Sequence, residues 1–132
     1  MANKIPTGMA QTVMGPISPD KLGLTDPHEH LLLDFSFAFK PPPEATEYHK
    51  AFEPVTEKNI GWVVYDPFRS LDNLVTLDEE VSISEASLFF RAGGQTMIDT
   101  TSNGIRRDPL ALARISRATG INIIMGSGYY ID

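Results

Sequence analysis

The chain has 132 residues, of which 42% are hydrophobic and 21% are charged, a composition typical of one ordinary globular domain. Its net charge of −6, without any run of lysine or arginine, argues against a nucleic-acid backbone as a partner. The absence of cysteine excludes disulfides and thiolate metal ligands, so any metal would be held by histidine, carboxylate or a modified side chain.

The sequence predicts neither a secretory signal at its N-terminus nor a membrane span. A basic region followed by an apolar core is missing, and no apolar run approaches the about 18 residues that span a membrane. We therefore expect a cytoplasmic protein that does not enter a membrane. Residues 1–12 are small, polar and aperiodic, which predicts a flexible lead, and Thr12–Ile17 predicts a short strand closed by a Gly-Pro turn.

The next segment, residues 24–34, contains two histidines one residue apart within an apolar run. In an extended strand, residues i and i+2 face the same side, so His28 and His30 would present two imidazoles together while Glu29 faces away. Neutral imidazole is the commonest protein ligand for zinc. The pair alone does not decide for a metal, because a histidine in an apolar region is more often a hydrogen-bonded core residue and His-x-His also occurs in jelly-roll barrels.

Residues 35–77 form a long connection, and a connection of this length inside a compact domain is usually functional. It opens with three alternating phenylalanines, Phe35, Phe37 and Phe39. They predict a strand with one face on the core or, alternatively, an aromatic wall beside the histidines. The prolines at 41–43 then stop regular structure and favour an extended segment.

Further along this connection the pattern predicts one short helix. Thr56 would be its N-cap, apolar residues at helical spacing would form one face, and Pro67 would end it. His49 lies in the polar part of the connection, where we expect it to be solvated.

Beyond residue 78 helices and strands alternate clearly. Asp78 predicts the cap of a helix that runs to Ala92 and stops at two glycines, and Asp108-Pro109 predicts the start of another that ends at Gly120. The β-rich runs between and after them predict strands over 95–101 and 121–125.

Alternating strands and helices predict an α/β protein with a parallel sheet and helical crossovers, which disfavours the jelly roll. In such proteins sites lie at the C-terminal ends of the strands. The histidines, residues 99–103 and residues 126–130 all follow predicted strands, so we expect them to converge. Asp99 is a candidate for orienting a metal-bound histidine, although a structural hydrogen bond at the strand end explains it equally well.

Several motifs, in this order, resemble the phosphotriesterase family of the amidohydrolase superfamily. They are Gly15-Pro16-Ile17, Leu22-Gly23, His28-Glu29-His30 with Leu31 to Asp34, Arg107-Asp108-Pro109, Ile115 to Gly120 and Met125 to Tyr130. The insert around Trp62 and Asp66-Pro67-Phe68 resembles the phosphotriesterase-related proteins more than the organophosphate hydrolases.

The resemblance implies a partial (β/α)8 TIM barrel, with about the first three βα units and a long insert, residues 35–77, after the first strand. Residues 1–132 would then be the N-terminal portion of one hydrolase domain. It also implies a centre of two divalent metals, most often zinc, in which His28 and His30 match the paired histidine ligands of the first strand. Tyr130 falls where family members place an aromatic residue of the substrate pocket.

The remaining ligands of such a centre come from later strands: a bridging carboxylated lysine or glutamate, two histidines and an aspartate. In the family a metal-bridging hydroxide attacks a phosphoryl or acyl centre. The resemblance thus implies a metal-dependent hydrolase of small-molecule esters: phosphotriesters, lactones or related carboxylic esters.

We expect the 132-residue chain alone to be inactive, because it lacks the ligands of the second metal and therefore the bridging hydroxide; no acid or base of the reaction can be assigned within it either. Its unpaired strand edges could pair with other copies, so a homo-oligomer is also expected. The alternative is a non-catalytic interaction module, or an inert fragment, derived from such a barrel.

Overall fold

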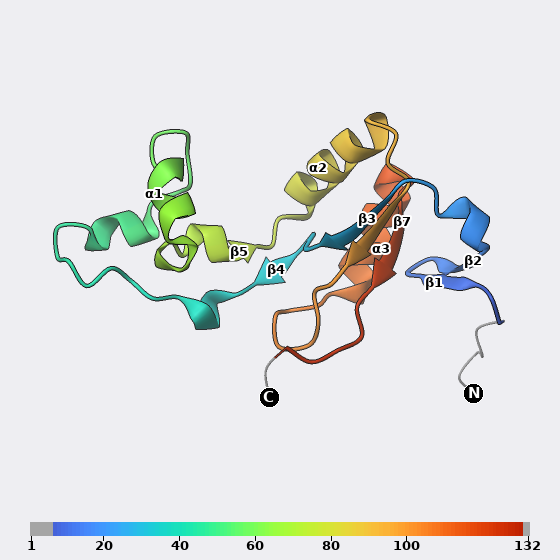
Figure 1. Cartoon of the computed structure of the whole chain (residues 1–132), viewed down its shortest axis with the longest axis horizontal. Coiled ribbons are helices and arrows are strands. Elements are labelled where there is room, and N and C mark those ends of the chain that lie inside the picture. The colour runs from blue at the N-terminus through green and yellow to red at the C-terminus, as the bar shows by residue number, and fades with distance from the viewer. Residues whose placement is uncertain (1–6, 131–132) are drawn as a thin grey trace. The chain divides into compact units, whose positions relative to one another are not determined.

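The computed structural model of the chain describes residues 7–130 and divides it into two compact units (Figure 1). The first unit combines residues up to Leu32 with those from Asp78 onward, and the second is Leu33–Leu77. Within residues 7–130, no helix is both long enough and apolar enough to cross a membrane.

The first unit is built on a parallel sheet of three strands. The strands β3 (Thr25–Glu29), β6 (Thr96–Asp99) and β7 (Asn122–Met125) are hydrogen-bonded in the order β3-β6-β7. Helix α2 (Glu79–Arg91) precedes β6, and helix α3 (Pro109–Thr119) connects β6 to β7. The expected α/β class with a parallel sheet is therefore confirmed.

Both helices begin and end where their local chemistry dictates. Asp78 and Asp108 are the N-caps. The side chain of each accepts hydrogen bonds from two backbone amides in the first turn of its helix. Pro109 occupies the first turn of α3, where its missing N–H costs nothing. Gly120 ends α3 with φ 78°, a left-handed conformation that glycine adopts without strain.

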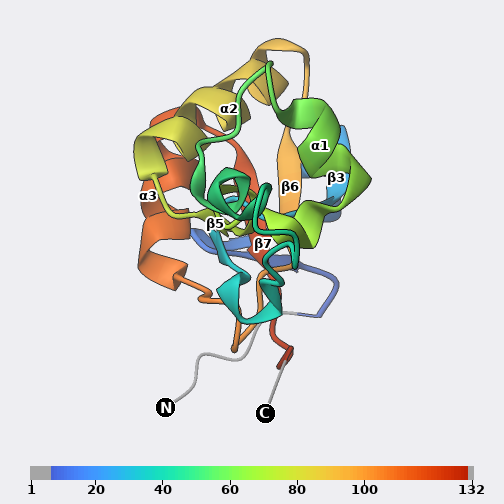
Figure 2. The same ribbon diagram turned by 90° about the vertical axis from the view of Figure 1, so that its left-hand side faces the viewer.

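The two helices lie side by side in both views (Figures 1 and 2) and cover the sheet. The core beneath them consists of buried aliphatic side chains from α2, α3, the strands and the segment after β3: Leu31, Leu32, Ala86, Met97, Ala111, Leu112, Ile115, Ile121 and Ile123. This packing fixes the strand ends that carry the site.

A short hairpin, β1 (Ala10–Thr12) and β2 (Gly15–Ile17), and then the turn η1 (Pro19–Lys21) precede the sheet along the chain. The expectation of a flexible lead is thus wrong for Ala10–Thr12, while its part in residues 1–6 lies outside the described residues. The hydroxyl of Thr12 stabilises the hairpin turn, because it donates to the Gly15 carbonyl at 2.7 Å and accepts from the Met14 amide at 3.1 Å.

The second unit has little regular structure. Its two-residue strands β4 (Leu33–Asp34) and β5 (Val75–Thr76) pair antiparallel, and α1 (Ile60–Tyr65) is its one α-helix. Four short 3-10 turns supply most of the rest: η2 (Ser36–Ala38), η3 (Tyr48–Phe52), η4 (Pro67–Arg69) and η5 (Asp72–Leu74).

Two expectations for this unit are wrong in detail. The alternating phenylalanines form no strand, because the Asp34 carboxylate accepts from both the amide and the hydroxyl of Ser36 and so stabilises the turn η2. The helix starts at Ile60 rather than directly after Thr56, and the turn between them is closed by the Ile60 amide, which donates to the Thr56 carbonyl at 2.9 Å. The helix does end before Pro67, as expected.

Candidate metal and substrate site at the strand ends

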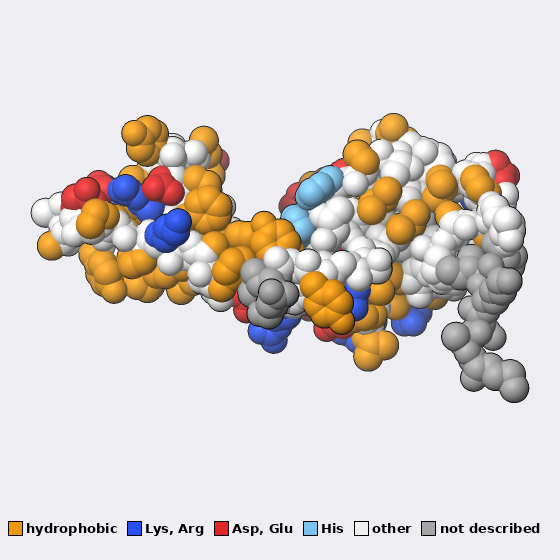
Figure 3. Space-filling model, turned by 60° about the horizontal axis from the view of Figure 1, so that its bottom comes forward, with side chains coloured by type: hydrophobic (Ala, Val, Ile, Leu, Met, Phe, Trp, Pro, Cys, Tyr) orange, Lys and Arg blue, Asp and Glu red, His pale blue; other side chains and the backbone are white. Residues whose placement is uncertain are grey.

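The two histidines lie at the C-terminal end of β3 with their rings against each other. The ring centres of His28 and His30 are 5.3 Å apart, and the ring planes meet at 78°. His28 is exposed and His30 half-buried, and histidine atoms reach the surface in Figure 3. The strand is irregular here, because its pairing with β6 shifts register between Asp26 and Glu29. The i, i+2 spacing nevertheless brings the imidazoles together, as expected.

The backbone of this segment is held by its own carboxylates. Asp26 accepts from the His28 amide at 3.1 Å, and Glu29 accepts from the His30 amide at 2.7 Å. These bonds use the carboxylates for the main chain and leave the imidazole rings to other partners.

The partners of the His30 ring come from the neighbouring strand end. Thr101 Oγ1 lies 2.9 Å from His30 Nδ1, and Thr100 Oγ1 lies 3.4 Å from Nε2. These threonines directly follow β6, and the register places Glu29 beside Asp99, so the two chain segments leave the sheet next to each other. The sequence marked residues 99–103 as a strand end, but the part played by the threonines was missed.

Asp99 is fully buried, and its two oxygens accept from two backbone amides. Oδ2 accepts from Leu31 and Oδ1 from Thr101, each at 2.9 Å. Burial raises the pKa of this carboxyl, and the hydrogen bonds from Leu31 and Thr101 oppose that rise. Asp99 thus holds two backbone amides at the strand ends and also interacts with the Thr101 side chain, whose hydroxyl contacts the His30 ring.

The loop after β7 is joined to the loop after β6. Asn103 donates from its amide to the Gly128 carbonyl at 3.2 Å and accepts at its carbonyl from the Tyr130 amide at 2.9 Å. Arg107 Nη1 donates to the Gly126 carbonyl at 2.8 Å. Tyr130 is 54% exposed, so its ring is accessible to a small molecule. The ends of β3, β6 and β7 therefore form one continuous row.

Gly126 allows a close approach of the backbone where β7 ends. A Cβ at this position would lie 3.2 Å from the backbone oxygen of Asp99, and the Gly126 amide donates to that same oxygen at 2.7 Å. A side chain here would require the ends of β6 and β7 to shift by a few tenths of an ångström.

The histidine pair fits the donors of a divalent metal. Two imidazoles bound to one tetrahedral zinc have ring centres about 5 Å apart, because each Zn–N bond is about 2.1 Å long. The 5.3 Å separation of His28 and His30 matches this arrangement. Among residues 7–130, however, no group of three or more histidine or carboxylate side chains is placed to hold a metal. His49 is 65% exposed and lies 3.7 Å from Glu53, which confirms that it is solvated.

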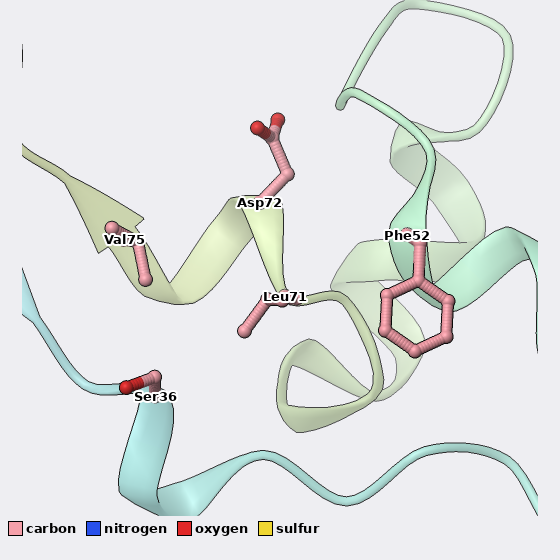
Figure 4. A pocket seen from close by; sticks show the side chains of 5 residues that line it. All are labelled: Ser36, Phe52, Leu71, Asp72 and Val75. Atoms are coloured by element: carbon pink, nitrogen blue, oxygen red, sulfur yellow. The ribbon is translucent and has the colours of Figure 1, made fainter.

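The second unit contains a separate hollow of about 430 Å³ (Figure 4). Its lining is mostly apolar and consists of Ser36, Phe52, Leu71, Asp72 and Val75. Asp72 accepts from the Val55 amide at 2.8 Å, so its carboxylate serves the local backbone. The hollow brings together no pair of acid and base groups.

Comparison with known proteins identifies the family to which this parallel α/β unit belongs. The chain belongs to the phosphotriesterase family, whose family model matches residues 8–132. An N-acetyltaurine hydrolase of Tetraodon nigroviridis is 39% identical over 127 residues, which cover 96% of this chain and 36% of the relative. The chain thus spans about a third of the length of the curated relatives it matches.

Solved structures also resemble this chain. A resiniferatoxin-binding protein from Rhodobacter sphaeroides superposes with a TM-score of 0.92 at 37% identity, over 97% of this chain and 36% of that one. A lactonase from Listeria monocytogenes superposes with a TM-score of 0.63 at 28% identity, over 91% of this chain and 28% of that one.

Proposed function

We propose that the full-length protein carrying this chain is a divalent-metal-dependent hydrolase, in which His28 and His30 supply the ligands of the first strand. The observation that carries the proposal is the edge-to-face pair of imidazoles, 5.3 Å apart at the C-terminal end of β3. Membership of the phosphotriesterase family supports it, as do relatives named as hydrolases.

The proposal places these three strands in a (β/α)8 barrel. A parallel sheet with helical crossovers is compatible with the first part of such a barrel. The bridging residue, the later histidines and the aspartate that the family resemblance implies would come from strands that follow residue 132. Zinc is the metal we expect, because the described donors are imidazoles.

Each part of the described site has a role in this proposal. A bound divalent metal supplies Lewis acidity and activates water. The chain's own residues hold the two imidazoles in place, through the Thr101 hydroxyl on His30 and through backbone bonds to Asp26 and Glu29. Tyr130, on the loop tied to β6, would form a wall against which a small substrate lies.

We propose a carboxylic acyl group as the centre of attack. N-acetyltaurine is an amide and a lactone is a cyclic ester, so the names of these two relatives describe cleavage at a carbonyl carbon. The more similar of the two carries the amide name, which extends the expected substrates from esters to N-acyl amides. Phosphotriesters are the comparison class.

The test uses the full-length protein stripped of metal with a chelator and reloaded with zinc or manganese. N-acetyltaurine, a γ-lactone and an aryl phosphotriester are assayed before and after reloading. Turnover should vanish with the metal and return with it, and His30→Ala should lower it by orders of magnitude while His49→Ala leaves it unchanged. Undiminished activity of the metal-free protein would refute the proposal.

A further inference from the structure

We propose that Thr101 is a positioning residue that fixes which nitrogen of His30 faces the metal; this rests on the proposed function. The hydroxyl of Thr101 would hold the proton of His30 on Nδ1 and so leave the lone pair of Nε2 free to bind. The contact joins a residue after β6 to a residue after β3.

The direction of the hydrogen bonds follows from counting protons. Thr101 Oγ1 lies 2.9 Å from His30 Nδ1 and 3.2 Å from the carbonyl oxygen of Leu32. The Leu32 carbonyl and the Asp99 carboxylate, which the Thr101 side chain also stabilises, can only accept, so the single hydroxyl proton of Thr101 has acceptors other than Nδ1. With its proton on one of these acceptors, the hydroxyl oxygen accepts from Nδ1, which then carries the one ring proton of a neutral imidazole.

Burial makes this assignment the favourable one. Thr101 is 1% exposed and Leu32 is 5% exposed, so water is poorly placed to replace either bond. In the reverse arrangement the hydroxyl would donate to Nδ1, and the Leu32 carbonyl would lose the hydroxyl as its donor. A buried polar group without a partner is costly.

The other ring nitrogen is only loosely approached. Thr100 Oγ1 lies 3.4 Å from Nε2, beyond the usual range for a hydrogen bond, and is equally close, at 3.3 Å, to the Glu29 carbonyl. A metal at Nε2 would displace no strong bond. The Thr101 hydroxyl should therefore matter for metal binding, and the Thr100 hydroxyl should not.

Thr101 is itself held firmly. Its amide donates to Asp99 Oδ1 at 2.9 Å, and Asp99 also binds the Leu31 amide. The hydroxyl is thus placed before any metal arrives, as an outer partner of a metal-bound histidine must be if it is to set the orientation of the ring.

The experiment compares four forms of the full-length protein: wild type, Thr101→Val, Thr101→Ser and the matched control Thr100→Val. Zinc affinity is measured by competition with a chromogenic chelator, and the tautomer of His30 is read in the metal-free protein by long-range ¹H–¹⁵N NMR, assigned with His30→Gln. Loss of an outer-shell partner typically weakens metal binding about 10- to 100-fold.

We expect wild-type His30 to carry its proton on Nδ1, Thr101→Val to lose that preference and bind zinc about 10- to 100-fold more weakly, and the other two variants to behave as wild type. A wild-type ring protonated on Nε2, or unchanged zinc affinity in Thr101→Val, would overturn the inference. If Thr101→Val fails to fold, the wild-type tautomer and the affinity of Thr101→Ser still decide it. If the wild type binds no zinc, the proposed function fails, whereas the tautomer separately tests the bond to Thr101.

Discussion

Replacing Asp99 by asparagine should expose how the strand ends are held together. The carboxylate uses one oxygen for each of two amides, Oδ2 for Leu31 and Oδ1 for Thr101, each at 2.9 Å. Asparagine offers one oxygen, and its NH₂ group would face the second amide, donor against donor. One buried N–H is therefore left without an acceptor whichever way the side chain turns.

The expected loss in the free energy of unfolding follows from that single unsatisfied amide. An unsatisfied buried donor costs about 1–3 kcal/mol, and Asp99 is fully buried, so water is poorly placed to compensate. Asp108→Asn is the matched control. Leu110 and Ala111 both donate to the same oxygen of Asp108, which asparagine retains. Asparagine and aspartate cap helices almost equally well, so this change should cost about 0.5 kcal/mol or less.

The measurement is urea unfolding of the full-length wild type and both variants at neutral pH, followed by far-UV circular dichroism. The midpoints, combined with a common m value, give the change in the free energy of unfolding. The reasoning would be refuted if Asp99→Asn were as stable as wild type, or if Asp108→Asn cost as much as Asp99→Asn.

Three further predictions follow from the same contacts. Burial raises the pKa of Asp99 above its ordinary value of 3.8, so the stability that its protonation contributes is complete below that value and is lost as pH rises through the folded-state pKa. Asp99→Asn should therefore lower the free energy of unfolding more at about pH 4 than at about pH 7, and an equal loss at both pH values would contradict this. Residues 1–132 alone should bind zinc weakly and hydrolyse none of the three substrates, because two imidazoles do not fill a tetrahedral site; calorimetry that gave one tight site would show otherwise. Arg107→Met should speed amide hydrogen exchange in residues 126–130, because the Arg107 guanidinium donates to the Gly126 carbonyl at the start of this loop. Arg117→Met, at an exposed arginine of α3, should not, and identical exchange in the two variants would show that this bond does not hold the loop.

The elements that the sequence predicted well are those with local signals. Asp78, Asp108 and Gly120 cap their helices through side-chain and backbone chemistry that depends on the next few residues alone. The strands between these helices then follow from apolar runs, and their parallel order from the alternation itself.

The second unit was harder to predict, because its conformation is decided by competition between side chains and the backbone. The Asp34–Ser36 bonds turn a chain whose phenylalanines alternate as in a strand, and the side chains of Thr56 and Asn59 bond to each other and to the backbone in a turn before α1. Such bonds have energies close to those of the regular structure they replace, so periodicity does not rank them.

At the site, the spacing of His28 and His30 was enough to predict that their rings lie together. The role of Thr101 was not accessible in the same way. It depends on the register of β6 against β3, which shifts between Asp26 and Glu29, and a shift of one residue would turn a different side chain toward the ring.

The most direct test of the central claim, that His28 and His30 hold a metal, is anomalous diffraction from crystals of the full-length protein loaded with zinc, collected on both sides of the zinc absorption edge. We predict a peak about 2.1 Å from one ring nitrogen of each histidine, with Nε2 as the ligand of His30. An active, zinc-loaded protein whose anomalous peaks all lie away from both rings would contradict the account.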